Sequence, residues 1–390
     1  NIVTLKDQDV ANVMTPRPDI MALDESISLG EAVDKALEHE FSRYPVYRDR
    51  LDEVVGIFYV KDAMRRMQED PEALADTPLR DLLRDPLFVP ETTGAAQLLR
   101  RAEQRARADE PPRGSILFLP GRGDHYEKYL ETLDQWSREG WYVTASDWRG
   151  QGTSKRLGRD PHTGHIEDFG IWTRDLSSLW DTWQAETPGP HVLIGHSMGG
   201  HLVLRALVEK RVDPDAVVLS APMLGLVGTP GPLWLLGPLS KGIARLGDPR
   251  RPAWKSSEKP GALPEDRGAL LTHDPDRYAD ELWWRDERPE VAMGPASWGW
   301  VAAAIESMRT IEAKGALETV ETPVLLFGTT NDQLVAWNAI ERAGQRLPYG
   351  EVLEFGDEAH HEIFREADRV RTRAMDGIAD FLDRKALRNT

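Results

Sequence analysis

A serine flanked by glycines lies where a buried strand is expected to lead into a helix. Residues 191–197 read HVLIGHS, an apolar run typical of a buried strand, and the amphipathic stretch MGGHLVLRALVEK follows from Met198. Gly195 and Gly199 complete a G-x-S-x-G pattern, in which the small residues let strand and helix meet at a sharp turn. Such a turn exposes the hydroxyl of Ser197 and directs the N–H of Met198 toward developing negative charge. The pattern therefore predicts that Ser197 is a nucleophile.

A nucleophilic serine needs a base, and the base needs an orienting carboxylate. On this kind of sheet the three groups follow the chain order serine, acid, histidine. Asp332 follows the apolar segment 322–330, and His360 and His361 follow the last predicted strand. These two are the histidines downstream of Asp332, so position alone leaves both open as the base. Asp332 also suits a turn or an N-cap ahead of the next helix, and either role is compatible with catalysis.

The second donor to an oxyanion is expected in the loop after the first strand of this region. That loop reads Pro120-Gly121-Arg122-Gly123, and the backbone N–H of Arg122 is the candidate beside that of Met198. The side chain of Arg122 has two interpretations: a phosphate-binding group at the mouth of the site, or a solvated loop arginine.

Other polar motifs are weaker candidates for chemistry. His162 and His165 lie close together but lack the glutamate of the zinc-protease pattern and a third ligand. Gly121 and Gly123 lack the third glycine of a dinucleotide-binding loop. The chain contains no cysteine, which excludes thiolate catalysis, disulfides and cysteine-bound zinc. We therefore expect neither a metal nor a cofactor.

Apolar strands alternate with helices through most of the chain. Strands are expected at 115–120, 142–148, 191–197, 215–222, 322–330 and 351–355, and helices at 124–139, 168–186, 198–210, from 335, and at 361–384. This alternation indicates an α/β fold with a mostly parallel sheet that is covered on both faces. A Pro- and Trp-rich insertion at about 223–300 is expected to form a helical cap over the site, or else an extra packing subdomain.

The chain is expected to form two domains, at 1–110 and 111–390. A charged helix predicted at 100–110 ends at Pro111-Pro112-Arg113-Gly114. The net charge of −17 disfavours nucleic acid and anionic membrane surfaces as partners. The sequence has no apolar run of the length that a transmembrane helix requires and no secretory leader, so we expect a cytoplasmic protein.

From about 115 to 385 the chain resembles the lysophospholipase and monoacylglycerol lipase branch of the α/β-hydrolases. The matching stretches are FLPGRGDHYEKY, SDWRGQGTS, GHIEDF, IGHSMGG, LSAPM, LLTHDP, GTTNDQLV and HHEIFRE. A His-Glu pair follows the last strand in that family and matches His361-Glu362, which favours His361 over His360 as the base.

The resemblance implies a serine hydrolase that cleaves carboxylic esters of monoacyl lipids with Ser197, Asp332 and His361. A transient contact of the cap with a membrane surface is compatible with such substrates. A short-chain carboxylesterase or a peptidase with the same three residues, and a non-catalytic sensor, are the alternatives.

Two departures from the family pattern stand out. Pro120-Gly121 replaces the usual His-Gly and resembles the bacterial lysophospholipase-like subgroup. The family's two antiparallel first strands would fall at 90–114, where the sequence favours a helix and a break. We therefore expect the strand at 142–148 to lie nearer an exposed sheet edge.

Four stretches of the N-terminal part are informative: VMTPR at 13–17, FSRYPVY at 41–47, VGIFYVKD at 55–62 and LFVPE at 87–91. The first three resemble one CBS repeat of the hemolysin-like proteins associated with magnesium and cobalt efflux, and LFVPE resembles the start of a second repeat. This resemblance implies a small α+β domain. CBS repeats act in pairs and can bind adenosine nucleotides, and Asp62 matches a position that commonly holds the ribose. Half of that cleft is absent, so packing against the hydrolase, pairing with a second chain in a homodimer, or an accidental gene junction are the alternatives.

Overall fold

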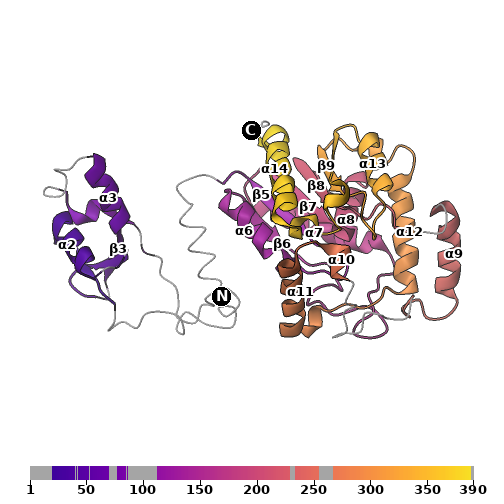
Figure 1. Cartoon of the computed structure of the whole chain (residues 1–390), viewed down its shortest axis with the longest axis horizontal. Coiled ribbons are helices and arrows are strands. Elements are labelled where there is room, and N and C mark those ends of the chain that lie inside the picture. The colour runs from indigo at the N-terminus through magenta and orange to yellow at the C-terminus, as the bar shows by residue number, and fades with distance from the viewer. Residues whose placement is uncertain are drawn as a thin grey trace. The chain divides into compact units, whose positions relative to one another are not determined.

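The computed structural model describes residues 20–39, 41, 43–51, 53–69, 77–84, 86, 112–228, 233–253 and 267–387. The chain divides into two compact units, Asn1–Pro111 and Pro112–Thr390 (Figure 1). Three sequence predictions lie outside the described residues: the charged helix at 100–110, the VMTPR stretch at 13–17, and the start of a second repeat at 87–91.

The N-terminal unit is a small α+β domain built on a four-stranded sheet. Its strands, in the order β1-β2-β3-β4, are β1 (Leu23–Asp24), β2 (Arg43–Tyr47), β3 (Val54–Tyr59) and β4 (Leu83–Arg84). The pairing of β1 with β2 is parallel, and the other two pairings are antiparallel. The helices are α2 (Leu29–His39), α3 (Val60–Glu69) and the 3₁₀ turn η3 (Leu79–Leu82). The side chains of Tyr44 and Val46 alternate with more exposed neighbours along β2 and are buried in the core of this unit.

Asp62 lies in the first turn of α3 and is bound by an arginine of the same unit. Its carboxylate accepts hydrogen bonds from Nε and Nη2 of Arg84, at 2.8 and 3.0 Å. The guanidinium groups of Arg84 and Arg43 also lie over the ring of Tyr59, at 4.4 and 5.2 Å from its centroid. The residue that the resemblance assigns to a ribose is therefore held by β4 in this structure.

The second unit contains a six-stranded sheet in which every pairing is parallel. In the order β10-β9-β8-β7-β5-β6, its strands are β10 (Gly350–Glu354), β9 (Val324–Gly328), β8 (Ala216–Ser220), β7 (His191–His196), β5 (Ser115–Leu119) and β6 (Tyr142–Ala145). The central strands are continuous apolar segments such as SILFL and VLLFG, and all of their residues are buried. Such segments fit a sheet that is covered on both faces.

Helices cover both faces of this sheet, because successive side chains of each strand point to opposite sides. Ile116 and Phe118 face one layer, which contains α6 (Leu130–Arg138) and α14 (Asp368–Lys385). Leu117 and Leu119 face the other layer, whose helices are α7 (Phe169–Glu186), α8 (Met198–Val208), α12 (Trp298–Glu312) and α13 (Trp337–Arg346). The predicted fold class is confirmed.

The ends of three predicted elements are wrong. The strand expected at 142–148 ends at Ala145, because Trp148 turns back and donates its ring N–H to the carbonyl of Pro120 at 2.9 Å. The helix expected at 124–139 starts as a 3₁₀ turn, η4 (Tyr126–Tyr129), before α6. The helix expected from 361 begins only at Asp368, because Glu366 accepts the backbone N–H groups of His360 and Ala367 and holds this segment as a loop.

Strand β6 lies at one edge of the sheet. Within the part of the chain that the structure describes, β6 pairs with β5 alone. The edge position of β6 matches the prediction, while residues 90–111, where the first hairpin is expected to be lacking, are outside the described residues.

The insertion between β8 and β9 is helical. It contains α9 (Leu233–Arg245), α10 (Gly268–Leu271), α11 (Pro275–Glu287) and the 3₁₀ turn η5 (Pro289–Val291), and it leads into α12. Helix α9 runs beside α12 (Figure 1). The carboxylate of Asp274 caps α11 by accepting the N–H groups of Asp276 and Arg277, both at 3.0 Å. None of the helices in the described ranges is long and apolar enough to cross a membrane.

The loop after β10 is anchored in the core by Phe364, whose side chain is 1% exposed. Its ring makes edge-to-face contacts with four aromatic rings from other elements, those of Phe118, Tyr129, Trp136 and Phe327. This packing places the loop on one face of the sheet.

We predict that Phe364→Ala lowers the free energy of unfolding by about 3–5 kcal/mol, because it leaves a cavity among these rings. Urea denaturation followed by tryptophan fluorescence measures this for the second unit alone, since all 13 tryptophans follow residue 135. The control Val352→Ala, at a position 41% exposed, is expected to stay within roughly 0.5 kcal/mol of the unsubstituted chain. Equal urea midpoints for the two variants would contradict the assigned packing.

Candidate active site

Ser197 occupies the turn between β7 and α8 in a strained backbone conformation. Its φ and ψ are 51° and −116°, a combination that residues with a side chain rarely adopt. The N–H of Ser197 donates to the carbonyl of Ser220 at 2.9 Å, and its carbonyl accepts the N–H of Met223 at 3.0 Å. The strand that neighbours β7 and the segment after it thus hold the serine in this conformation.

The glycines around Ser197 are required by close backbone contacts. A Cβ on Gly199 would overlap the carbonyl oxygens of Leu119 and Pro120, and one on Gly195 would lie 2.7 Å from the backbone nitrogen of Gly200. The crossing of β7, α8 and the end of β5 therefore leaves no room for side chains at these positions.

The structure brings together the serine, the acid and one of the two candidate histidines. His361 Nε2 lies 3.0 Å from Ser197 Oγ, and His361 Nδ1 lies 2.7 Å from Asp332 Oδ2. The other oxygen of Asp332 accepts the N–H groups of Leu334 and Val335 at 2.8 and 3.0 Å. One carboxylate therefore both holds the turn after β9 and orients the histidine. The N-cap interpretation of Asp332 is wrong, because the N-cap of the next helix, α13, is Ala336.

His360 points elsewhere. Its ring stacks on that of His273, with centroids 3.8 Å apart, and its Nδ1 lies 3.4 Å from Asn331 Nδ2. Only one of the adjacent histidines thus contacts Ser197.

The surrounding charges raise the pKa of His361 and lower that of Asp332. Burial alone would lower the pKa of His361, but the charge and hydrogen bond of Asp332 outweigh it, with smaller contributions from Glu362 and Asp124, and the pKa is raised. Burial alone would raise the pKa of Asp332, yet His361 and the two backbone N–H groups lower it. The carboxylate is therefore ionised at neutral pH, and the imidazole is a stronger base than an isolated buried histidine.

The loop proposed to supply an oxyanion donor passes directly beside the serine. A Cβ on Gly121 would lie 3.1 Å from Ser197 Cβ. The N–H of Gly121 donates to Asp124 Oδ2 at 3.3 Å, and that of Gly123 donates to Gln151 Oε1 at 2.8 Å. The two residues that flank Arg122 are thus held by side chains. Met198 is the first residue of α8, where backbone N–H groups lack partners within the helix.

The side chain of Arg122 is half-buried rather than solvated, which corrects one of its two sequence interpretations. Its Nη2 donates to the carbonyl of Gly294 at 2.7 Å, and its guanidinium lies 5.3 Å from the centroid of the Trp300 ring. Arg122 thereby ties the loop after β5 to the end of the helical insertion. Phosphate binding by this side chain stays a prediction.

Sequence reasoning missed a group of buried charges next to the site. We call Asp124, Lys128, Glu281, Glu362 and Arg365 the Lys128 cluster; each of these residues is buried. Asp124 and Lys128 lie in the matching stretch FLPGRGDHYEKY, but nothing in their local pattern reveals a partner such as Glu281 that is distant in the sequence.

Three of the residues near this cluster have the types and spacing of metal ligands. The ligand atoms of Asp124, His196 and Glu362 lie within 4.8 Å of one another. The ammonium of Lys128, however, is 3.0 Å from Asp124 and 2.7 Å from Glu362, so a protein cation already neutralises these carboxylates. The sequence pointed instead to His162 and His165. The ring of His165 contacts the hydroxyl of Ser297 at 2.7 Å, and the backbone N–H of His162 donates to Asp160 at 2.9 Å.

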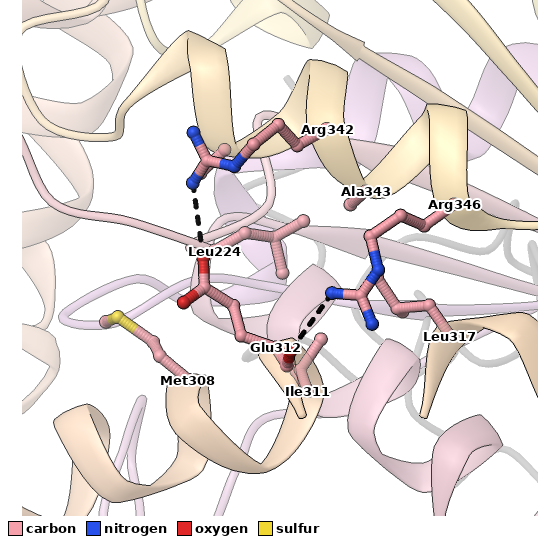
Figure 2. Close-up of a pocket in the computed structure, with 9 residues that line it drawn as sticks. Leu224, Met308, Ile311, Glu312, Leu317, Arg342, Ala343 and Arg346 are labelled. Carbon is pink, nitrogen blue, oxygen red and sulfur yellow. Dashed lines mark hydrogen bonds and ion pairs between the residues drawn. The ribbon is translucent and has the colours of Figure 1, made fainter. Parts of the chain in front are cut away.

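The pocket in Figure 2 lies between α12 and α13, with apolar side chains such as Met308 and Ile311 in its lining. Its arginines are paired, since Arg342 donates to the carboxylate of Glu312 and Arg346 to its carbonyl, both at 3.1 Å. Its lining includes none of the three residues of the Ser–His–Asp arrangement. We therefore assign it to helix packing and not to the active site.

Comparisons with known proteins match both parts of the chain. A family model described as serine aminopeptidase, S33, matches residues 110–368, which is more than half of the chain. A CBS-domain model matches residues 10–69.

Individual relatives agree with these matches. Lysophospholipase L2 of Escherichia coli is 30% identical over 283 residues, which cover 69% of this chain and 80% of that protein. Hemolysin C of Brachyspira hyodysenteriae is 30% identical over 105 residues, which cover 27% of this chain and 37% of that protein. Both resemblances that the sequence indicated are confirmed.

Among solved structures, a soluble variant of monoglyceride lipase from Saccharomyces cerevisiae, in complex with a substrate analog, aligns with a TM-score of 0.57. The alignment covers 72% of this chain and 89% of that one, at 18% identity. At this level of identity the likeness supports the fold alone.

We predict that Asp332→Asn lowers the pKa of His361. The substitution removes the negative charge that raises this pKa and leaves the burial that lowers it. A pH titration of the ring Cε1–H resonances by NMR measures the change, and His191, at the opposite end of β7, serves as the internal control. An unchanged pKa for His361 in the variant would contradict the assigned pairing.

Proposed function

Because the chain belongs to the hydrolase family whose model is described as serine aminopeptidase, S33, we propose that it hydrolyses carboxylic esters of monoacyl lipids through Ser197. The observation that carries the proposal is the hydrogen-bonded series from Ser197 through His361 to Asp332. The substrate class is supported by the name of a relative, the lysophospholipase L2 of Escherichia coli.

In the first half of the reaction, Ser197 Oγ attacks the ester carbonyl while His361 Nε2 accepts the hydroxyl proton. The distance of 3.0 Å between these atoms is suitable for this transfer. The imidazolium that forms is stabilised by the carboxylate of Asp332, which stays ionised, at 2.7 Å from Nδ1.

The carbonyl oxygen becomes negatively charged in this step. We assign its stabilisation to the backbone N–H groups of Met198 and Arg122, the first at the start of α8 and the second in the loop held by Asp124 and Gln151. Loss of one such donor typically slows catalysis about 10²- to 10³-fold.

In the second half, His361 gives its proton to the leaving alcohol, and the C–O bond of the ester breaks. A water molecule then loses a proton to His361 and attacks the acyl carbon. The bond between that carbon and Ser197 Oγ breaks, His361 returns the proton to Oγ, and the fatty acid is released.

We predict that Ser197→Ala and His361→Ala each lower kcat for lysophosphatidylcholine and monoacylglycerol hydrolysis by about 10⁴-fold or more, because each removes a member of the reacting unit. The matched control is His360→Ala, which removes the adjacent imidazole. Its kcat is expected to stay within roughly tenfold of that of the unsubstituted chain, because His360 does not contact Ser197. Circular dichroism confirms that the variants are folded.

The choice of substrates tests the ester and chain-length assignments at the same time. Hydrolysis of p-nitrophenyl acetate and of an aminoacyl p-nitroanilide is measured alongside, and both are expected to have lower kcat/KM than the monoacyl lipids. Faster cleavage of the anilide would favour a peptidase, and faster cleavage of the acetate a short-chain esterase. If folded Ser197→Ala hydrolysed the ester as fast as the unsubstituted chain, that result would contradict the mechanism.

A further inference from the structure

The ammonium of Lys128 is buried among three carboxylates. Its Nζ lies 3.0 Å from Asp124, 2.9 Å from Glu281 and 2.7 Å from Glu362, and the Lys128 side chain is 2% exposed. All three carboxylates are also almost completely buried. An ammonium has three N–H donors, so each carboxylate can receive one.

These three carboxylates come from three separate segments of the second unit, two of which lie beside the serine. Asp124 belongs to the loop after β5 and accepts the N–H of Gly121, which lies beside Ser197. Glu362 directly follows His361 in the loop after β10. Glu281 lies on α11, in the helical insertion. Lys128 therefore connects the proposed oxyanion loop, the histidine loop and the insertion at a single atom.

Further bonds join the insertion to the histidine loop. The N–H of His361 donates to the carbonyl of Leu270 at 3.4 Å, and that of Glu362 donates to Leu271 at 2.8 Å. The hydroxyl of Thr272 donates to the carbonyl of Arg365 at 2.7 Å. The part of the insertion that carries α10 and the start of α11 thus follows the histidine loop along its backbone.

Arginines in and beside the Lys128 cluster complete the balance of its charges. Arg365 Nη1 donates to Glu362 at 2.6 Å and to Glu281 at 3.3 Å, and Arg285 lies 2.8 Å from Glu281. Together with Lys128, these arginines balance the three carboxylates. Buried ion networks are costly to form and contribute little net stability compared with apolar packing, but loss of one partner leaves a charge uncompensated. Stability alone therefore gives a weak reason for placing this network beside the serine.

We propose that Lys128 is a positioning residue that holds the oxyanion loop and the His361 loop in register against Glu281 of α11. The α10–α11 part of the insertion is then a fixed component of the active site and not a lid that moves away from it. The proposal rests on the proposed function, because its effect is measured on Ser197 chemistry.

The test compares Lys128→Met, Lys128→Arg and Glu281→Gln with the unsubstituted full-length chain on a p-nitrophenyl ester. The concentration of active sites is determined by stoichiometric reaction with a fluorophosphonate, so that rates refer to folded sites only. Arg205→Met is the matched control, because Arg205 forms an ion pair with Glu209 at 2.8 Å on α8, away from the Lys128 cluster.

Lys128→Met is expected to lower kcat per active site about 10- to 100-fold, in the range produced by small misplacements of reacting groups. KM is expected to stay within roughly threefold, since no substrate contact is removed. Lys128→Arg should have a kcat between those of Lys128→Met and the unsubstituted chain. Glu281→Gln should also lower kcat, and it provides the test if Lys128→Met does not fold. Arg205→Met should lower the unfolding temperature with kcat per site unchanged.

The pH profile separates positioning from a merely structural role. His361 is faced by Asp332, Glu362, Asp124 and the ring of His196, whose centroid is 4.9 Å away. Without the ammonium of Lys128, Asp124 loses the cation beside it and Glu362 keeps only Arg365. The less compensated negative charge on these two carboxylates then raises the pKa of His361 further. The acidic limb of the kcat/KM profile of Lys128→Met should therefore move to higher pH, while that of Arg205→Met stays in place.

The failure of this inference is distinguishable from the failure of the proposed function. An unsubstituted chain that neither turns over the ester nor reacts with the fluorophosphonate overturns the proposed function. An active unsubstituted chain, with Lys128→Met and Glu281→Gln variants that keep its kcat per site and its acidic limb, overturns the positioning role of Lys128.

Discussion

At Ser197 the chain turns from β7 into α8 with a positive φ of 51°, a conformation that costs about 1–3 kcal/mol for a residue with a side chain. The surrounding fold holds this turn. β7 lies inside the sheet between β5 and β8, and glycines at 195, 199 and 200 allow the helix to start against the ends of those strands. The strain is useful because it presents the hydroxyl at the edge of the sheet, beside the N–H groups at the start of α8.

A parallel sheet brings the remaining groups to the same edge. Asp332 and His361 follow β9 and β10, and the loop with Arg122 follows β5, so strands far apart in the chain deliver their next residues to one place. Contacts outside the sheet also hold these loops in place. Phe364 anchors the histidine loop in the core, and the Lys128 cluster joins it to α11. The loops of the candidate active site therefore have contacts with the insertion as well as with the sheet.

Much of this could be predicted from the sequence where the signal is local. The turn at Ser197 and the strand–helix alternation follow from neighbouring residues, and the chain order limits the acid and the base. Position could not separate His360 from His361, because only the folded loop, with Glu366 bound to the N–H of His360, decides which ring reaches Ser197. The same carboxylate delays the start of α14. The contact between Lys128 and Glu281 joins residues that no periodicity relates, so the sequence carries no sign of it.

We propose that the fold activates one serine among all hydroxyl groups of the chain. The most direct test of this proposal is the reaction of the 390-residue chain with a long-chain alkyl fluorophosphonate, followed by intact mass measurement and peptide mapping. A single adduct is expected on the peptide that contains Ser197, and no adduct is expected on folded Ser197→Ala. An unmodified protein, or an adduct on a different residue, would contradict it.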